Sequence, residues 1–197
     1  VKFLMHLELS LFTGIVPREW VAVHRKHHYF SDKEGDPHSP LLEGMWKVLF
    51  GNFFMYRKAK SDAIMVKRFT PDWKPDLIDR IPGNSYGVIG GLAVFCLMFG
   101  WNRGFAAWLT HASLYILLNS AINSLGHMVG YRTYKNRATN LKWLALLTAG
   151  EGLHNNHHER PTSPNFLASH DEIDPGWNAI RILRVLGLAY VETEVRI

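Results

Sequence analysis

Charge-free apolar stretches alternate with polar, basic segments along the chain, and the apolar stretches predict membrane helices. Residues 1–16 are largely apolar and predict the end of one such helix. Residues 81–102 contain no charged side chain, and residues 104–127 contain none apart from two histidines. Each of these two stretches is long enough to cross a hydrocarbon core, which needs about 20 residues. They therefore predict a transmembrane hairpin that turns near Arg103.

The polar segments predict a cap of helices outside the membrane. Residues 18–80 are rich in Lys and Arg, whereas the hairpin turn carries one arginine, so the positive-inside rule places residues 18–80 and 131–197 in the cytoplasm. Within this cap, residues 18–30 predict a polar helix, residues 31–40 a loop and residues 151–159 a further helix. Residues 41–56 mix aromatic and polar positions at helical spacing, which suits a helix lying in the membrane interface.

The expected fold is thus an all-α integral membrane protein, with a transmembrane helical bundle and a cytosolic helical cap in one domain, residues 1–197. Two alternatives stay open at this point. The interfacial helix could be an ordinary amphipathic helix on a soluble core, and the hairpin could be the buried hairpin of a soluble protein.

Composition limits the possible kinds of binding site more than it limits the possible folds. Hydrophobic residues make up 47% and the formal net charge is +5, but no nucleic-acid recognition motif accompanies the basic residues. A cytosolic membrane face or an anionic substrate head group explains the charge better. The single cysteine, Cys96, excludes a disulfide framework and any metal site built on several cysteines. Eleven histidines beside it point to nitrogen ligation.

The pattern H-x-x-H-H occurs twice, 130 positions apart, in six histidines: His24, His27, His28, His154, His157 and His158. On a helix, positions i, i+3 and i+4 share one face, so each triplet aims three imidazoles at roughly one point. Three titratable groups on one face are poor core material, because they repel when protonated and each needs a partner when neutral. A metal ion that binds the neutral nitrogens resolves both problems.

A third element is the pair Asn123 and His127, spaced i, i+4 at the predicted cytosolic end of the second membrane helix. Polar residues at that depth are costly and usually functional. Seven histidines in three groups exceed the four ligands of a structural zinc site, and they suit two iron ions that activate oxygen. The zinc-protease patterns H-E-x-x-H and H-x-x-E-H are absent.

Four segments carry a resemblance to the membrane fatty acid desaturases of the acyl-CoA type. Residues 18–28 resemble the second histidine box of that family, residues 36–40 the loop after it, residues 123–132 its N-x-x-x-H segment and residues 150–158 its third box. The resemblance implies four membrane helices under a cytosolic cap and a centre of two iron ions. It also implies that an acyl-CoA chain gains a cis double bond while O2 is reduced to water. The electrons would come from a separate ferredoxin-, rubredoxin- or cytochrome b5-like protein with its reductase.

The resemblance also implies roles for single residues. The seven histidines of the three groups are the expected direct ligands, and Asn123 is expected to ligate through a water. Asp36, Glu151 and Asp171 are candidates to hold imidazole N–H groups. Three further candidates would contact substrate: Trp20 along the acyl channel, and Arg25 and Lys26 at the CoA head group. Packing for Trp20 and a solvated basic face for the other two are the alternatives. His38, His111 and His170 are expected to be structural or surface residues.

One departure from the family pattern concerns the first histidine box, H-x-x-x-x-H, which the chain does not contain. His6 has no partner at that spacing. We therefore expect an N-terminally truncated desaturase. The alternatives are a membrane fatty-acid or alkane hydroxylase with similar histidine boxes, an inactive desaturase remnant, and a soluble histidine-rich metal-binding module.

Overall fold

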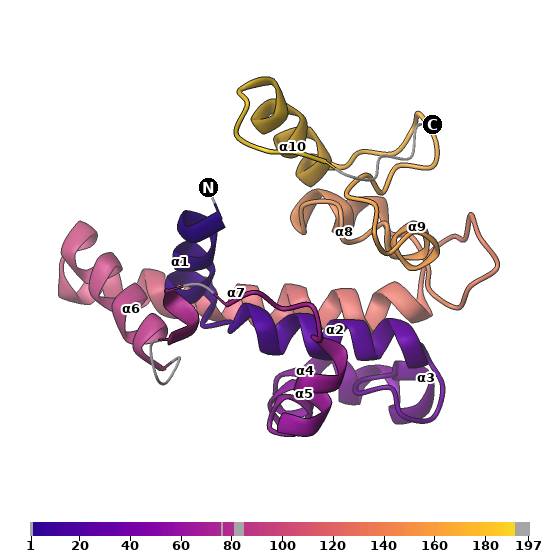
Figure 1. Cartoon of the computed structure of the whole chain (residues 1–197), viewed down its shortest axis with the longest axis horizontal. Helices are drawn as coiled ribbons and strands as arrows, with labels where there is room; N and C mark the ends of the chain where they lie inside the picture. Colours follow the sequence, from indigo (N-terminus) through magenta and orange to yellow (C-terminus); the bar gives the residue numbers. More distant parts are fainter. Residues whose placement is uncertain (1, 76, 81–84, 192–197) are drawn as a thin grey trace. The chain divides into compact units, whose positions relative to one another are not determined.

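The computed structural model describes residues 2–75, 77–80 and 85–191, and these residues form helices joined by loops, with no strand (Figure 1). The predicted all-α class is confirmed. The elements are α1 (Lys2–Thr13), α2 (Pro17–Phe30), α3 (Pro40–Glu43), α4 (Met45–Lys60), α5 (Ala63–Phe69), the 3-10 turn η1 (Ile78–Arg80), α6 (Ser85–Phe99), α7 (Trp101–Met128), α8 (Lys142–Leu147), α9 (His154–Glu159) and α10 (Pro175–Val185).

Helix α2 carries the first histidine triplet. It begins at Pro17, whose missing N–H is one that a helix start leaves unpaired anyway. Glu19 lies in the first turn, where an acidic group favours the helix dipole, and it accepts a hydrogen bond of 2.7 Å from Lys60. The helix ends at Phe30, and Asp32 just beyond it has a left-handed φ of 59° that no α-helix continues.

The single helix predicted for residues 41–56 is divided in two. Ser39 caps α3, since its hydroxyl accepts from the Leu42 N–H, and Gly44 breaks the helix with a φ of 93° before α4 starts. The exposed side of α4 is aromatic and includes Trp46, Phe50, Phe53 and Phe54. An interfacial position for α4 remains a prediction.

The chain divides into two compact units, one built on residues 1–25 and 57–117 and the other on residues 26–56 and 118–197. Helices α2, α4 and α7 each include residues of both units.

In the first unit, two glycines one helical turn apart let α6 approach α1 closely. A Cβ added to Gly87 would lie 2.3 Å from the carbonyl oxygen of Ser10, and one added to Gly91 would lie 1.9 Å from that of Leu11. Such small-x-x-x-small pairs let helix backbones meet where side chains would hold them apart. The same device recurs in the hairpin, where a Cβ on Gly104 at the start of α7 would lie 2.5 Å from the Phe95 carbonyl oxygen.

Gly91→Ala is expected to lower stability, because the new methyl group overlaps backbone that cannot rotate away. Overpacking of this kind costs about 1–3 kcal/mol. Gly51→Ala in α4 is the matched control, since a Cβ there meets no atom within 4 Å and alanine favours a helix by up to about 1 kcal/mol. Thermal unfolding in detergent should therefore shift in opposite directions for the two variants, and equal shifts would contradict the packing.

Among the described residues, α7 alone is long and apolar enough to cross a membrane, by length and composition. Its 28 residues span about 42 Å, which exceeds a hydrocarbon core of about 30 Å. Helix α6 has 15 residues and spans about 22 Å. The predicted span 81–102 includes residues 81–84, which lie outside the described residues. The hairpin itself is present, turning at Gly100 with a φ of 76°. The membrane bundle remains a prediction.

In the second unit, the loop after α7 and the segment before α9 are joined through Asn140. Its backbone pairs with Tyr131 on one side and with Leu153 on the other as isolated antiparallel bridges. Leu144 of α8 and Leu153, just before α9, are both fully buried and belong to the core of this unit. The helix predicted to start at Glu151 begins three residues later, at His154.

Candidate metal centre

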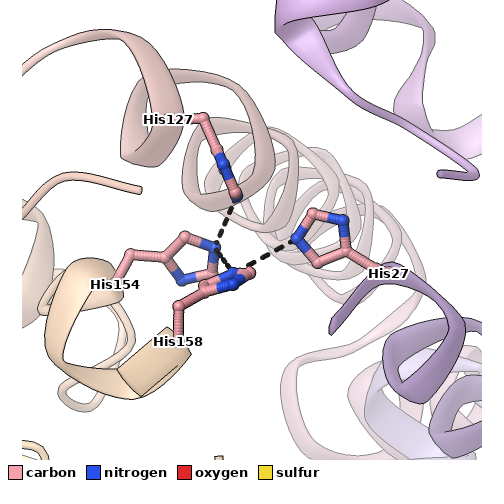
Figure 2. Close-up of side chains that lie close together, drawn as sticks. All are labelled: His27, His127, His154 and His158. Carbon is pink, nitrogen blue, oxygen red and sulfur yellow. Dashed lines mark hydrogen bonds between the residues drawn. The ribbon is translucent and has the colours of Figure 1, made fainter. Parts of the chain in front are cut away.

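Four histidine side chains from three helices converge in the second unit (Figure 2). His27 comes from α2, His127 from the end of α7, and His154 and His158 from α9. The Nε2 atom of His154 lies 3.1 Å from that of His127 and 3.1 Å from that of His158, and His158 Nε2 lies 3.2 Å from His27 Nε2. Segments 131 positions apart therefore meet at one point.

Two carboxylates orient two of these imidazoles from behind. Asp36 accepts a hydrogen bond of 2.9 Å from Nδ1 of His27, and Asp32 accepts one of 2.7 Å from Nδ1 of His127. All four side chains are fully buried. Because a carboxylate only accepts, each Nδ1 must carry the hydrogen, and in the neutral ring Nε2 then presents a lone pair to the cluster.

A metal ion fits this donor set. The rings of His27 and His127 point Nε2 lone pairs inward, and His154 and His158 add two more Nε2 atoms at 3.1–3.2 Å. Facing lone pairs repel unless a proton or a cation lies between them. Imidazole nitrogens about 2.0–2.1 Å from a tetrahedral metal lie about 3.4 Å apart, close to the distances found. Burial, with His154 and His27 nearby, also holds the pKa of His158 well below its ordinary value, which favours the neutral, ligating form.

The loop between α2 and α3 supplies both carboxylates. Asp36 was a sequence candidate for this role, whereas Asp32 was not. Burial acts to raise the pKa of Asp32, but the hydrogen bond from His127 and further contacts bring it below its ordinary value. Ser39 also donates to Asp32, at 2.6 Å, and Arg137 donates to the Asp32 carbonyl oxygen. The sequence did contain one signal for the role of Asp32. It is an acidic residue just past the helix end, a position where Asp tolerates a left-handed conformation.

Of the other three histidines of the two triplets, two form a pair. The Nε2 atoms of His28 and His157 lie 2.9 Å apart. Burial lowers the pKa of His28 to about 4 and that of His157 to about 3. His24 lies one helical turn before His28 on α2, in the first unit, where its ring stacks on Trp20 with centroids 4.6 Å apart.

The N-x-x-x-H segment lies at the end of α7. Asn123 is buried and its amide donates to the Asn119 carbonyl oxygen at 3.2 Å, so its side-chain oxygen is the atom it can offer to a bound water. Gly126, next to His127, lies against the His154 ring: a Cβ there would be 3.1 Å from the nearest ring atom. Glycine at this position lets the third box approach the helix end.

Of the three residues expected to contact substrate, one is held in an ion pair. Arg25 donates to both carboxylate oxygens of Asp72, at 2.5 and 2.9 Å, and to the Phe69 carbonyl oxygen. Trp20 stacks on His24 as described, and Lys26 is half-buried on α2. Contact of these residues with substrate remains a prediction.

The remaining candidates to hold imidazole N–H groups lie elsewhere. Asp171 is exposed and binds Lys142 and Ser169. Burial, with Asp174 nearby, raises the pKa of Glu151 to about 7, and its contact with a histidine remains a prediction.

The three single histidines lie in different surroundings. His111 bonds the Phe12 carbonyl oxygen at 2.7 Å, and His170 is exposed. His38 is buried, and its ring lies 4.6 Å from that of His27, centroid to centroid. With His27 and Asp36 it forms a further group of side chains that could hold a metal ion, so its purely structural role remains a prediction.

Metal-free protein is expected to lose stability as pH falls from about 6.5. The native pKa values of His28 and His157 lie below the unfolded value near 6.5, so the unfolded chain binds more protons in this range. Their contribution is complete above pH 6.5 and disappears as pH falls toward 4 and then 3. Each unit of pKa difference corresponds to about 1.4 kcal/mol. Urea unfolding at pH 7, 6, 5 and 4.5 measures it. His157→Gln should flatten the dependence, while His170→Gln should leave it unchanged.

Comparisons with known proteins identify relatives of this chain. A model described as fatty acid desaturase matches residues 1–168. The chain is 34% identical over 180 residues to the sn-1 stearoyl-lipid 9-desaturase of Anabaena variabilis, covering 88% of this chain and 64% of that protein. It is 35% identical over 178 residues to the enzyme of the same name from Synechocystis sp., covering 87% of this chain and 54% of the relative.

A plant relative is similar to the chain over a comparable length. The Delta-9 acyl-lipid desaturase 2 of Arabidopsis thaliana is 32% identical over 189 residues, covering 92% of this chain and 59% of that protein. The chain therefore spans between 54% and 64% of the length of these curated relatives. The family match over most of the chain, together with these relatives, shows that the chain belongs to the fatty acid desaturase family.

Proposed function

We propose that this protein forms the metal-binding core of an O2-dependent desaturase that introduces a cis double bond into a saturated fatty acyl chain. The observation that carries the proposal is the convergence of four imidazoles, two of them oriented by buried carboxylates. Two histidine-bound iron ions would supply the oxygen activation that removal of hydrogen from unreactive C–H bonds requires.

The residues divide the work as follows. His27, His127, His154 and His158 would hold one iron, and Asp36 and Asp32 would hold the Nδ1–H groups of His27 and His127 so that Nε2 of each ring is aimed inward. The pair His28 and His157 would contribute to the second iron, with Asn123 through a water. His24, one turn earlier on α2, remains a predicted ligand. Burial of the cluster excludes bulk water and holds the pKa of His158 below its ordinary value.

The acyl carrier is the finer part of the proposal. The resemblance in the sequence favoured acyl-CoA, with Arg25 and Lys26 at the head group. The relatives are named for stearoyl-lipid and acyl-lipid substrates, and Arg25 is already paired with Asp72. We therefore favour an acyl chain esterified to a membrane lipid, desaturated at the Δ9 position. O2 and a separate small electron-donor protein complete the reaction, and the site would open on the cytoplasmic side.

Expression in membranes of a host that lacks Δ9 desaturation tests the function. We expect monounsaturated acyl chains by gas chromatography and mass spectrometry, dependent on O2, and two irons per chain by elemental analysis. Brief labelling with stearate should show the double bond first in the lipid fraction. Its appearance first in acyl-CoA would restore the CoA carrier. An alcohol product would favour a hydroxylase, and bound iron without product would favour an inactive remnant.

A further inference from the structure

The helix that carries the third histidine box lacks a cap of its own. Helix α9 has six residues, and helices this short are unstable unless tertiary contacts support them. The first N–H groups of a helix need acceptors, which the side chain just before the helix usually provides. Here that residue is Leu153, whose side chain accepts no hydrogen bond.

Asn140 supplies the missing acceptor from elsewhere in the chain. Its Oδ1 accepts from the backbone N–H groups of Asn155 at 2.9 Å and Asn156 at 3.3 Å. These are the second and third residues of α9, the positions that an N-cap side chain serves. Asn140 precedes them by 15 and 16 residues, so this cap is remote in sequence.

The position of Asn140 is itself fixed. Its backbone exchanges hydrogen bonds of 2.7 and 3.2 Å with Tyr131, and the next residue, Leu141, donates to Gly152 at 2.8 Å. Its Nδ2 donates to Oδ1 of Asn156 at 2.8 Å. Asn140 is fully buried, so water cannot replace these contacts.

The two asparagines between the histidines also fix α9, through hydrogen bonds to neighbouring segments. Asn155 Oδ1 accepts from the backbone N–H groups of Thr133 and Tyr134 at 2.8 and 2.7 Å. Asn156 Nδ2 donates to the carboxylate of Glu172 at 3.0 Å. In His154-Asn155-Asn156-His157-His158 the asparagines therefore bind the surrounding loops, while the histidines face the candidate metal centre.

We propose that Asn140 is a positioning residue that caps α9 from a distance and thereby sets the direction of His154 and His158 toward the metal. The inference rests on the proposed function, since it assumes that a metal binds these imidazoles. It concerns a residue outside the histidine boxes that contacts no ligand atom. Its removal leaves every imidazole in place in the sequence and changes only how firmly the third box is aimed.

Asn140→Ala tests this, with Asn140→Asp as the conservative variant and the exposed Asn178→Ala in α10 as control. Aspartate keeps the acceptor for both N–H groups and loses the bonds that Nδ2 donates to Asn156 and Thr133. Purified protein in detergent is titrated with Co²⁺, whose visible absorption reports ligand geometry. Hydrogen exchange of the metal-free protein follows the amides of residues 155 and 156. We expect about tenfold weaker Co²⁺ binding, as is usual when a support of a ligand is lost, an altered spectrum and faster exchange at these two amides in Asn140→Ala.

Asn140→Asp should restore the exchange protection and most of the affinity. Wild-type affinity in Asn140→Ala would overturn the inference. The inference would also be overturned if Asn140→Asp lost as much Co²⁺ affinity as Asn140→Ala and hydrogen exchange became faster throughout the second unit. That pattern would indicate general destabilisation. If the wild-type protein bound no metal, the proposed function would fail, yet selective exchange at residues 155 and 156 would still establish the cap.

Discussion

Replacing His154 by alanine is expected to reduce desaturated product by more than about 100-fold and to remove bound iron. Its Nε2 lies between those of His127 and His158, at 3.1 Å from each, so its loss opens the middle of the cluster. Residues that only orient a ligand typically cost 10–100-fold when changed, and a direct ligand should exceed that range. Product analysis and iron content of the same membranes measure the effect.

A folding defect has to be separated from a lost ligand. His154→Gln fills similar space without an imidazole, so it should fold like the wild type and still lack iron. The exposed His170 is the matched control, and His170→Ala should change neither product nor iron. Normal iron content in His154→Gln would show that this imidazole is not a ligand.

Asp32→Asn is expected to weaken metal binding about tenfold, because the amide oxygen carries no charge and leaves His127 less basic. Asparagine tolerates the left-handed φ of 59° at this position, so the backbone should keep its shape. Asp32→Gly also permits that conformation and removes the acceptor altogether, so its effect should approach 100-fold. Titration with Co²⁺ or Fe²⁺ under anaerobic conditions gives the affinities.

The graded losses of affinity expected for Asp32→Asn and Asp32→Gly identify the role of Asp32. Asp171→Asn removes an exposed carboxylate of the same unit that binds Lys142, and it should leave the affinity unchanged. Equal losses in Asp32→Asn and Asp171→Asn would point to a general effect of charge. No loss in Asp32→Gly would show that His127 keeps its orientation without this carboxylate.

The spacing of the histidines predicted much of the candidate site. Helical periodicity placed three imidazoles on one face of each triplet, and the triplets do meet. Periodicity could not tell how the triplets divide. His27 joins His154 and His158, while His28 pairs with His157. This division depends on tertiary packing, which has no simple sequence signal.

Other features depended on backbone details that are equally hard to read. Asp32 reaches His127 because the chain turns through a left-handed conformation just after α2, which a count of acidic residues in the loop does not reveal. From the local sequence, helix α9 was predicted to begin at Glu151. Its start at His154 reflects the acceptor on Asn140, which is close in space and distant in sequence.

Helix α7 runs unbroken from Trp101 to Met128 and carries both the apolar length for a membrane and His127 at its end. Each residue inserted or deleted along it would turn His127 by about 100° and move it by about 1.5 Å along the axis. In the predicted membrane bundle, the number of residues in this helix would therefore be fixed by the position of His127. Adaptation of such a bundle to a thicker or thinner membrane would have to use side chains and tilt, at constant residue number.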